Sequence, residues 1–291
     1  MNLISELHIT PQDTLVSCGD LLDKGPFSHL VVSYLRTLGI NGCKVVLVCG
    51  NHEERHARYR KAIATSPKEV SKFKNWQEME TITEQLSDKD IEFLDSAVLF
   101  HPLPEYNAVV VHGGILPDIE RLPTPREFAA LSRGERERLL RVLRVRYLTE
   151  KRTVDLVLEA KNIAGMDLEP EVGAHITLSA IMEAASSDVE TTVTHKKVKP
   201  KWSFIPLGEE GPKDPFWADV YDGRFGRVYF GHSPYPELSE PKQFKHATGL
   251  DLGCVFGGRL CAAVLELGKE WKHVSVPAIK KYATSYWETD S

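Results

Sequence analysis

The stretch that most constrains the fold is residues 17–26, which read SCGDLLDKGP. It follows two apolar residues, so we expect a buried strand that ends in a glycine-rich turn. Such a turn places Asp20 and Asp23 at the carboxyl edge of the strand, where open α/β sheets build their sites. Carboxylates bind hard cations, glycines let the backbone approach an anion, and Lys24 supplies positive charge. The run indicates a site for metal and phosphate, and its alternative is an ordinary strand-to-turn segment with acids at a helix start.

Three later stretches repeat this design, an apolar strand followed by glycine and a polar turn. They are GNHE at residues 50–53, HGG at residues 112–114 and GHSP at residues 231–234. Four such turns in this order resemble the calcineurin-like metallophosphoesterases, in particular the branch that holds protein Ser/Thr phosphatases and bacterial diadenosine tetraphosphatases. Residues 249–260, GLDLGCVFGGRL, are similar to the closing signature of the diadenosine-tetraphosphatase (ApaH-like) side.

The resemblance implies an α/β fold, a two-sheet α/β/β/α sandwich. A chain of 291 residues can bury a sizeable core, and we expect a single domain over 1–291 with an insertion at about 151–214. Helical spacing of apolar residues predicts a helix over residues 27–38 and another from Thr124 to Tyr147. We expect a strand over residues 97–100 and its hairpin partner over 108–111, with Pro102 and Pro104 in the turn.

Composition limits the classes of partner and compartment. The net charge of −5 argues against a general nucleic-acid binder, so we expect no stable nucleic-acid binding. No apolar run approaches the length of a membrane span, and the five cysteines fit reduced thiols of a reducing compartment. We therefore expect a cytoplasmic protein, whereas a longer N-terminus with an anchor would allow a vacuolar location.

By resemblance, four side chains are metal ligands. Asp20 would bridge two metals, and Asn51, His112 and His232 would complete the second. Two divalent cations about 3.5–4 Å apart can clamp a phosphate, activate water and stabilise developing charge. The family binds Mn²⁺ or Zn²⁺, and an oxygen and nitrogen donor set also accepts Mg²⁺ or Fe. Each histidine alone would more often be structural, so the ligand hypothesis depends on the set at the strand ends.

The resemblance also assigns catalytic and phosphate-binding side chains. His52 would be the general acid that protonates the leaving oxygen, and Asp23 would hold its imidazole. Lys24 and Arg146 are candidates for binding the substrate phosphate, with Arg144 as the alternative to Arg146 and solvated arginines as the alternative to both. We expect a structural role for Glu53, and structural or exposed positions for the histidines outside the motifs. These are His8, His29, His56, His101, His175, His195, His246 and His273.

Position 24 bears on the substrate. Protein phosphatases carry arginine there, which grips two phosphate oxygens, whereas Lys24 is a point charge. Lysine followed by Gly-Pro resembles the eukaryotic ApaH-like subgroup, which includes fungal endopolyphosphatases. We therefore expect a polyanionic phosphate substrate cleaved at phosphoanhydride bonds, inorganic polyphosphate first or dinucleoside polyphosphates, with a protein Ser/Thr phosphatase as the alternative. The basic segment 53–74 is either a polyanion-facing rim or a solvated helix face.

One motif of the family is missing from the sequence. A D-x-H-G turn lies roughly 25–30 residues before the G-D-x-x-D run in relatives and supplies an Asp and a His to the first metal. Counting back from Asp20 places it before Met1. We expect either an N-terminally truncated chain or a protein with half its metal site. The second case would be an inactive phosphate-binding protein, and residues 1–291 alone should bind about one metal.

Overall fold

The computed structural model describes residues 2–151, 157–159, 192–194 and 201–284. The chain forms two compact units, one made of Met1–Thr149 with Phe204–Ser291 and the other of Glu150–Ser203. The insertion predicted at about 151–214 overlaps this second unit, whereas residues 204–214 belong to the larger one. Much of the second unit lies outside the described residues.

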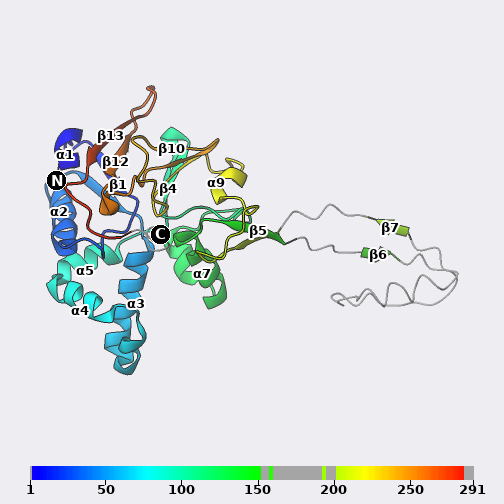
Figure 1. The fold of residues 1–291 in the computed structure, drawn as a ribbon, viewed down its shortest axis with the longest axis horizontal. Helices are drawn as coiled ribbons and strands as arrows, with labels where there is room; N and C mark the ends of the chain where they lie inside the picture. Colours follow the sequence, from blue (N-terminus) through cyan, green and yellow to red (C-terminus); the bar gives the residue numbers. More distant parts are fainter. Residues whose placement is uncertain (1, 152–156, 160–191, 195–200, 285–291) are drawn as a thin grey trace. The chain divides into compact units, whose positions relative to one another are not determined.

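The larger unit contains a five-stranded mixed sheet in the order β10-β11-β9-β4-β3. Its strands β4 and β10 are labelled in Figure 1. Its strands are β3 (Phe100–Leu103), β4 (Ala108–Val111), β9 (Arg227–Phe230), β10 (Lys242–Gln243) and β11 (Ala247–Gly249). The central strands β4, β9 and β11 are parallel, and β3 and β10 pair antiparallel to them. Parallel pairing brings the carboxyl ends of β4 and β9, with the residues that follow them, to one edge of the sheet.

A second layer of strands packs against this sheet. It contains the parallel pair β1 (Thr14–Ser17) and β2 (Lys44–Leu47) and the antiparallel hairpin of β12 (Arg259–Val264) and β13 (Lys272–Pro277). One buried cluster joins Val110 and Tyr229 of the larger sheet to Val48, with Val16 and Ala263 packed against it. Apolar side chains from both layers therefore share one core, as in sandwich folds.

Helices complete the larger unit on the side of β1 and β2. They are α2 (Ser28–Ile40), α3 (Asn51–Thr65), α4 (Trp76–Gln85) and α5 (Asp88–Asp95). α2 contacts β2, α4 and α5. Leu22, Val32, Ile82, Leu86 and Leu94 form the buried cluster between them. The predicted α/β fold class, helices packed on a mixed two-layer β structure, is confirmed.

Two local predictions were wrong for identifiable reasons. The strand before β4 is Phe100–Leu103 instead of residues 97–100, so Pro102 lies inside it. Proline is tolerated there because β3 is an edge strand, whose outward N–H groups need no partner strand. The helix predicted from Thr124 to Tyr147 is interrupted after α6 (Pro125–Ala130), because Ser132 caps a new helix, α7 (Arg133–Leu139), together with Glu135.

The remaining described elements are short. In the larger unit they are α1 (Asn2–Leu7), α9 (Trp217–Val220) and the 3₁₀ turns Pro67–Lys72, Pro104–Tyr106, Leu140–Leu143 and Cys254–Phe256. β5 (Leu148–Lys151) pairs with β8 (Lys201–Phe204), and β6 (Val157–Glu159) pairs with β7 (Thr192–Thr194). Among the described helices, none combines the length and the apolar character that crossing a bilayer requires.

Candidate metal centre

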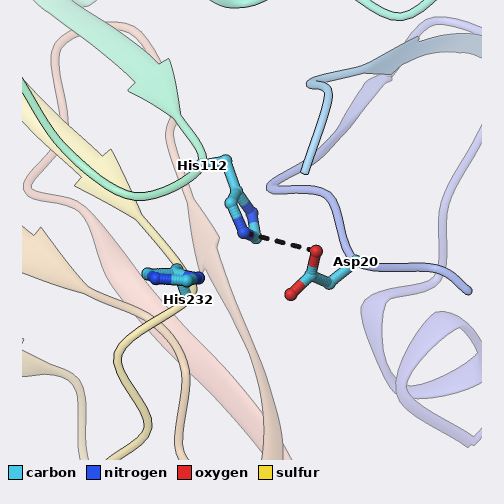
Figure 2. A group of neighbouring side chains, drawn as sticks. All are labelled: Asp20, His112 and His232. Carbon is cyan, nitrogen blue, oxygen red and sulfur yellow. Dashed lines mark ion pairs between the residues drawn. The ribbon is translucent and has the colours of Figure 1, made fainter. Parts of the chain in front are cut away.

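Three potential metal ligands converge where β1, β4 and β9 end. Asp20, His112 and His232 offer donor atoms that all lie within 4.8 Å of one another (Figure 2). Asn51 joins them, since its Oδ1 lies 3.1 Å from His112 Nε2, and Asp20 Oδ1 lies 3.3 Å from the same nitrogen. The structure thus brings together all four side chains that the sequence analysis named as metal ligands.

The turn after β1 has an unusual backbone. Asp20, Asp23 and Lys24 have φ values of 57°, 68° and 59°, and Gly19 has a φ of 90°. His232 has a φ of 64°. Residues other than glycine rarely adopt this left-handed region, and they persist there only when the surroundings hold them. Four of the seven non-glycine residues with a positive φ in the described chain therefore lie in or beside the centre.

Two glycines allow the turn after β1 to lie directly on the start of α3. A Cβ added to Gly50 would lie 2.3 Å from Asp20 Oδ1 and 2.5 Å from Asp20 N. A Cβ on Gly19 would lie 2.7 Å from Gly50 N. Any side chain at either position would push the two segments apart. Both glycines therefore keep Asp20 and Asn51 within reach of one ion.

Glu53 stabilises the contact between the turn after β1 and the start of α3. Its carboxylate accepts hydrogen bonds from four backbone N–H groups, those of Asp20 (2.7 Å), Gly50 (2.9 Å), Leu21 (2.8 Å) and Leu22 (3.3 Å). The side chain is buried, and burial together with the facing Asp20 carboxylate raises its pKa. Glu53 points to the backbone instead of the cluster, which agrees with the structural role expected for it.

The donor set suits a divalent cation. His112 Nδ1 lies 2.7 Å from the carbonyl oxygen of Cys18 and donates to it, so in a neutral ring Nε2 carries the lone pair. That nitrogen faces the oxygens of Asp20 and Asn51, so three acceptors meet unless a proton or a cation lies between them. Burial lowers the pKa of His112, but the facing Asp20 outweighs it and raises the pKa. Two imidazoles, a carboxylate and an amide oxygen fit Zn²⁺, Mn²⁺ or Fe.

The environment of His232 favours a neutral imidazole, which is the form that binds metals. Its pKa is well below the usual value because the ring is buried and because Arg146 and His112 lie nearby. Its Nε2 is buried and has no hydrogen-bond partner among the described residues. A buried nitrogen of this kind is destabilising unless a ligand completes it. Burial would raise the pKa of Asp20, but the surrounding histidines hold it well below its usual range, so Asp20 stays ionised.

The two predicted catalytic residues form a close pair beside the cluster. His52 Nδ1 lies 2.5 Å from Asp23 Oδ2, and His52 Nε2 lies 3.9 Å from Asp20 Oδ2. Asp23 also accepts from Arg55 Nη2 at 2.8 Å and contacts His56 Nε2 at 2.8 Å. Burial alone would raise the pKa of Asp23, but hydrogen bonds from His52 and His56 outweigh it and lower the pKa. Asp23 is therefore a carboxylate that orients the His52 ring.

The candidate phosphate-binding cations lie at the rim of the cluster. Lys24 is exposed, and its ammonium lies 5.4 Å from the centre of the Phe256 ring. Arg146 donates to the carbonyl oxygen of His232 at 2.7 Å, while its buried Nε has no partner in the described chain. Arg144, the alternative, contacts Glu54 at 3.1 Å. Arg144 also donates to the carbonyl oxygen of Asn51 at 3.4 Å, so both arginines border a candidate ligand, and Arg146 is distinguished by its buried, unpartnered Nε.

The basic segment 53–74 is largely paired with acids. Arg55 contacts Asp23, and Arg58 bonds Glu54 at 2.6 Å. Arg60 forms an ion pair with Asp95, and Lys72 bonds Glu69 at 2.7 Å. This pairing favours a solvated, ion-paired helix face over a polyanion-facing rim.

Sequence reasoning missed the partners of Asp23. His56 was expected to be structural or exposed, and Arg55 was counted only as part of the basic segment. The signal was their spacing: positions 52, 55 and 56 share one face of a helix that starts at residue 51.

The comparisons with known proteins agree with this geometry. Residues 1–163, more than half of the chain, match the family model "Calcineurin-like phosphoesterase". A crystal structure of a "putative diadenosine tetraphosphatase" superposes with a TM-score of 0.54 at 24% identity, covering 95% of this chain and 86% of that one. No curated protein is similar enough to match. At this identity, the structural likeness shows a shared fold.

Proposed function

Since this chain belongs to the calcineurin-like phosphoesterase family, we propose that its cluster binds divalent metal and hydrolyses phosphoanhydride bonds. The family membership makes it a hydrolase of phosphate compounds. The substrate, the metal and the residue roles are the proposal.

The observation that carries the proposal is the convergence of Asp20, His112 and His232 within 4.8 Å, beside the His52–Asp23 pair. An ion held there would supply an activated water and stabilise charge on the phosphoryl group. The cluster alone would suit a structural metal. A histidine held by a carboxylate 2.5 Å away, with its other nitrogen turned to the cluster, supports catalysis.

The protein side chains take the following parts. In the doubly protonated imidazolium form of His52, Nδ1 donates to Asp23 and Nε2 carries the proton that is transferred to the leaving oxygen. Lys24 and Arg146 lie on the rim and neutralise non-bridging phosphate oxygens. Glu53 and the two glycines keep Asp20 and Asn51 in register.

Lys24 supports phosphoanhydrides over phosphoproteins. The exposed ammonium of Lys24 attracts negative charge without a fixed geometry. The guanidinium of an arginine would instead bind two oxygens of a single phosphate monoester. Inorganic polyphosphate is our first substrate and dinucleoside polyphosphate the second. The structural neighbour described as a putative diadenosine tetraphosphatase is compatible with the second.

The test measures metal-dependent shortening of polyphosphate chains, cleavage of a dinucleoside tetraphosphate to nucleotides and release of phosphate from a phosphoserine peptide, each with Mn²⁺, Zn²⁺ or chelator. We expect internal cleavage of polyphosphate, loss with chelator, and weak or no turnover of the peptide. Turnover of the peptide alone would replace the proposal with a protein phosphatase. Metal-dependent phosphate binding without turnover of any substrate would make the chain a phosphate-binding protein.

A further inference from the structure

The two oxygens of Asp23 are held by different groups. Oδ2 accepts from His52 Nδ1 at 2.5 Å and from Arg55 Nη2 at 2.8 Å, whereas Oδ1 faces His56 Nε2 at 2.8 Å. All three contacts come from α3, while Asp23 itself sits in an irregular turn with a φ of 68°. The helix is therefore the rigid element, and its side chains orient the carboxylate.

Packing alone does not account for His56. The residue is fully buried, at 0% exposure, and its Nδ1 lacks a partner among the described residues. A buried position on a helix is ordinarily filled by an apolar side chain, because an unpaired polar atom there is destabilising. The other ring nitrogen of His56, Nε2, contacts Oδ1 of Asp23, and this polar contact accompanies the burial of the ring.

We infer that His56 is a positioning residue, which fixes the rotation of the Asp23 carboxylate and so keeps His52 Nε2 turned toward the metal cluster. The last torsion of an aspartate side chain is broad, so a carboxylate held through one oxygen can rotate. A donor on Oδ1 removes that freedom and leaves Oδ2 for His52. The inference rests on the proposed function, in which His52 protonates the leaving oxygen.

The first test compares two substrates that depend on His52 to different degrees. Phenyl phosphate releases a basic phenolate that needs the proton, whereas p-nitrophenyl phosphate releases a stabilised anion that leaves without it. Metal-loaded residues 1–291 carrying His56→Leu should lose about tenfold in kcat on phenyl phosphate and less than about twofold on p-nitrophenyl phosphate. His56→Gln should restore most of the loss, because its amide can donate to Oδ1.

Tyr59→Phe is the matched control. Tyr59 is also fully buried on α3, and its hydroxyl has no partner in the described chain, so this change removes a buried polar atom outside the network. It should leave both substrates unchanged. Equal losses on the two substrates in His56→Leu, with a normal melting temperature, would overturn the inference.

The second test needs no activity. The Nδ1 proton of His52 should give a strongly deshielded NMR signal, assigned by its loss in His52→Gln. We expect it to shift or broaden in His56→Leu and to persist in His56→Gln and Tyr59→Phe. A signal that is missing in the wild type, or unaffected by His56→Leu, would overturn the inference. If the signal responds as expected while the wild type hydrolyses neither polyphosphate, nor the dinucleoside tetraphosphate, nor the two aryl phosphates, the proposed function fails and the positioning role stands.

Discussion

The two halves of the candidate centre differ in how their polar groups are satisfied. In the half built from the β1 turn and α3, protein groups surround the carboxylates: Asp23 has three nitrogen partners, and Glu53 has four backbone donors. In the half built from the ends of β4 and β9, buried polar atoms lack partners in the described chain. These are His232 Nε2, Ser233 Oγ and Arg146 Nε.

The first half therefore determines the geometry of the centre, and the second half adds atoms that bind ligands. The carboxylates Asp23 and Glu53 of the first half are completed by the chain itself, so they hold their geometry before any ligand arrives, although His56 Nδ1 on α3 has no partner in the described chain. In the second half, His232 Nε2 and Arg146 Nε have no partner in the described chain, and a cation at the first and an anion at the second would complete them. We therefore expect changes in the first half to act through geometry and stability, and changes to the ligands to act on binding.

The largest effect should come from the one carboxylate among the ligands. Asp20→Asn keeps the shape of the side chain but removes the charge that holds the cation. We expect activity and metal affinity to fall by more than about a hundredfold, which exceeds the loss typical of residues behind the ligands. Isothermal titration with Mn²⁺ measures the affinity, and the shortening of polyphosphate chains measures the activity. Asp95→Asn, an exposed acid paired with Arg60, is the control and should change neither.

Gly50→Ala tests the first half directly. The new Cβ would lie 2.3 Å from Asp20 Oδ1, so the turn and α3 must separate. We expect about 1–3 kcal/mol of lost stability from this overpacking, and about tenfold weaker metal binding as the ligands move apart. Gly134→Ala is the control, because a Cβ there meets nothing within 4 Å and should be neutral or stabilising. Equal behaviour of the two variants would contradict the close approach.

Glu53→Gln removes charge without removing volume. Each oxygen of Glu53 accepts from two backbone N–H groups, so either amide orientation turns an NH₂ group toward two donors. We expect about 1–3 kcal/mol of destabilisation in urea unfolding, the penalty of unsatisfied buried donors. A variant as stable as the wild type would show that the four bonds do not hold the turn.

Asp90→Asn is the reference variant outside the candidate centre, against which the stability effects of the other variants are compared. Burial would raise the pKa of Asp90, but hydrogen bonds from Ser87 and Arg36 outweigh it and lower the pKa. The carboxylate therefore stabilises the fold above its ordinary pKa of about 3.9, and this stabilisation is lost as the pH falls through the lowered folded value. We expect about 1 kcal/mol of lost stability at neutral pH, with unchanged metal affinity. Thermal melts should converge with the wild type in acid; a constant gap would contradict the linkage.

The sequence predicted the site best where a candidate ligand directly follows a strand. Asp20, His112 and His232 each follow a short apolar run, and parallel pairing of β4 with β9 brings the two histidines to one edge although 120 positions separate them in the chain. Such convergence follows from topology and can be expected once the strands are recognised. The side chain of Asn51 follows the same logic after β2.

Contacts that depend on an irregular turn could not be predicted in this way. The left-handed turn aims Asp23 at α3, and no periodicity in the sequence indicates that direction, so the sequence predicts only a structural or exposed position for His56. The predicted bounds of β3 were wrong for a similar reason. Proline indicates a turn unless the strand is known to lie at the edge of a sheet, as β3 with Pro102 does. Local patterns identified the elements, whereas tertiary partners decided these details.

The central claim is that one cation binds at the end of β1, β4 and β9. An anomalous difference map from crystals of residues 1–291 soaked with Zn²⁺ tests it most directly. We expect a peak bonded to Asp20, Asn51, His112 and His232, at the separations of about 2.0–2.2 Å that Zn²⁺ prefers. A map with no peak at these side chains, while zinc is bound elsewhere, would contradict it.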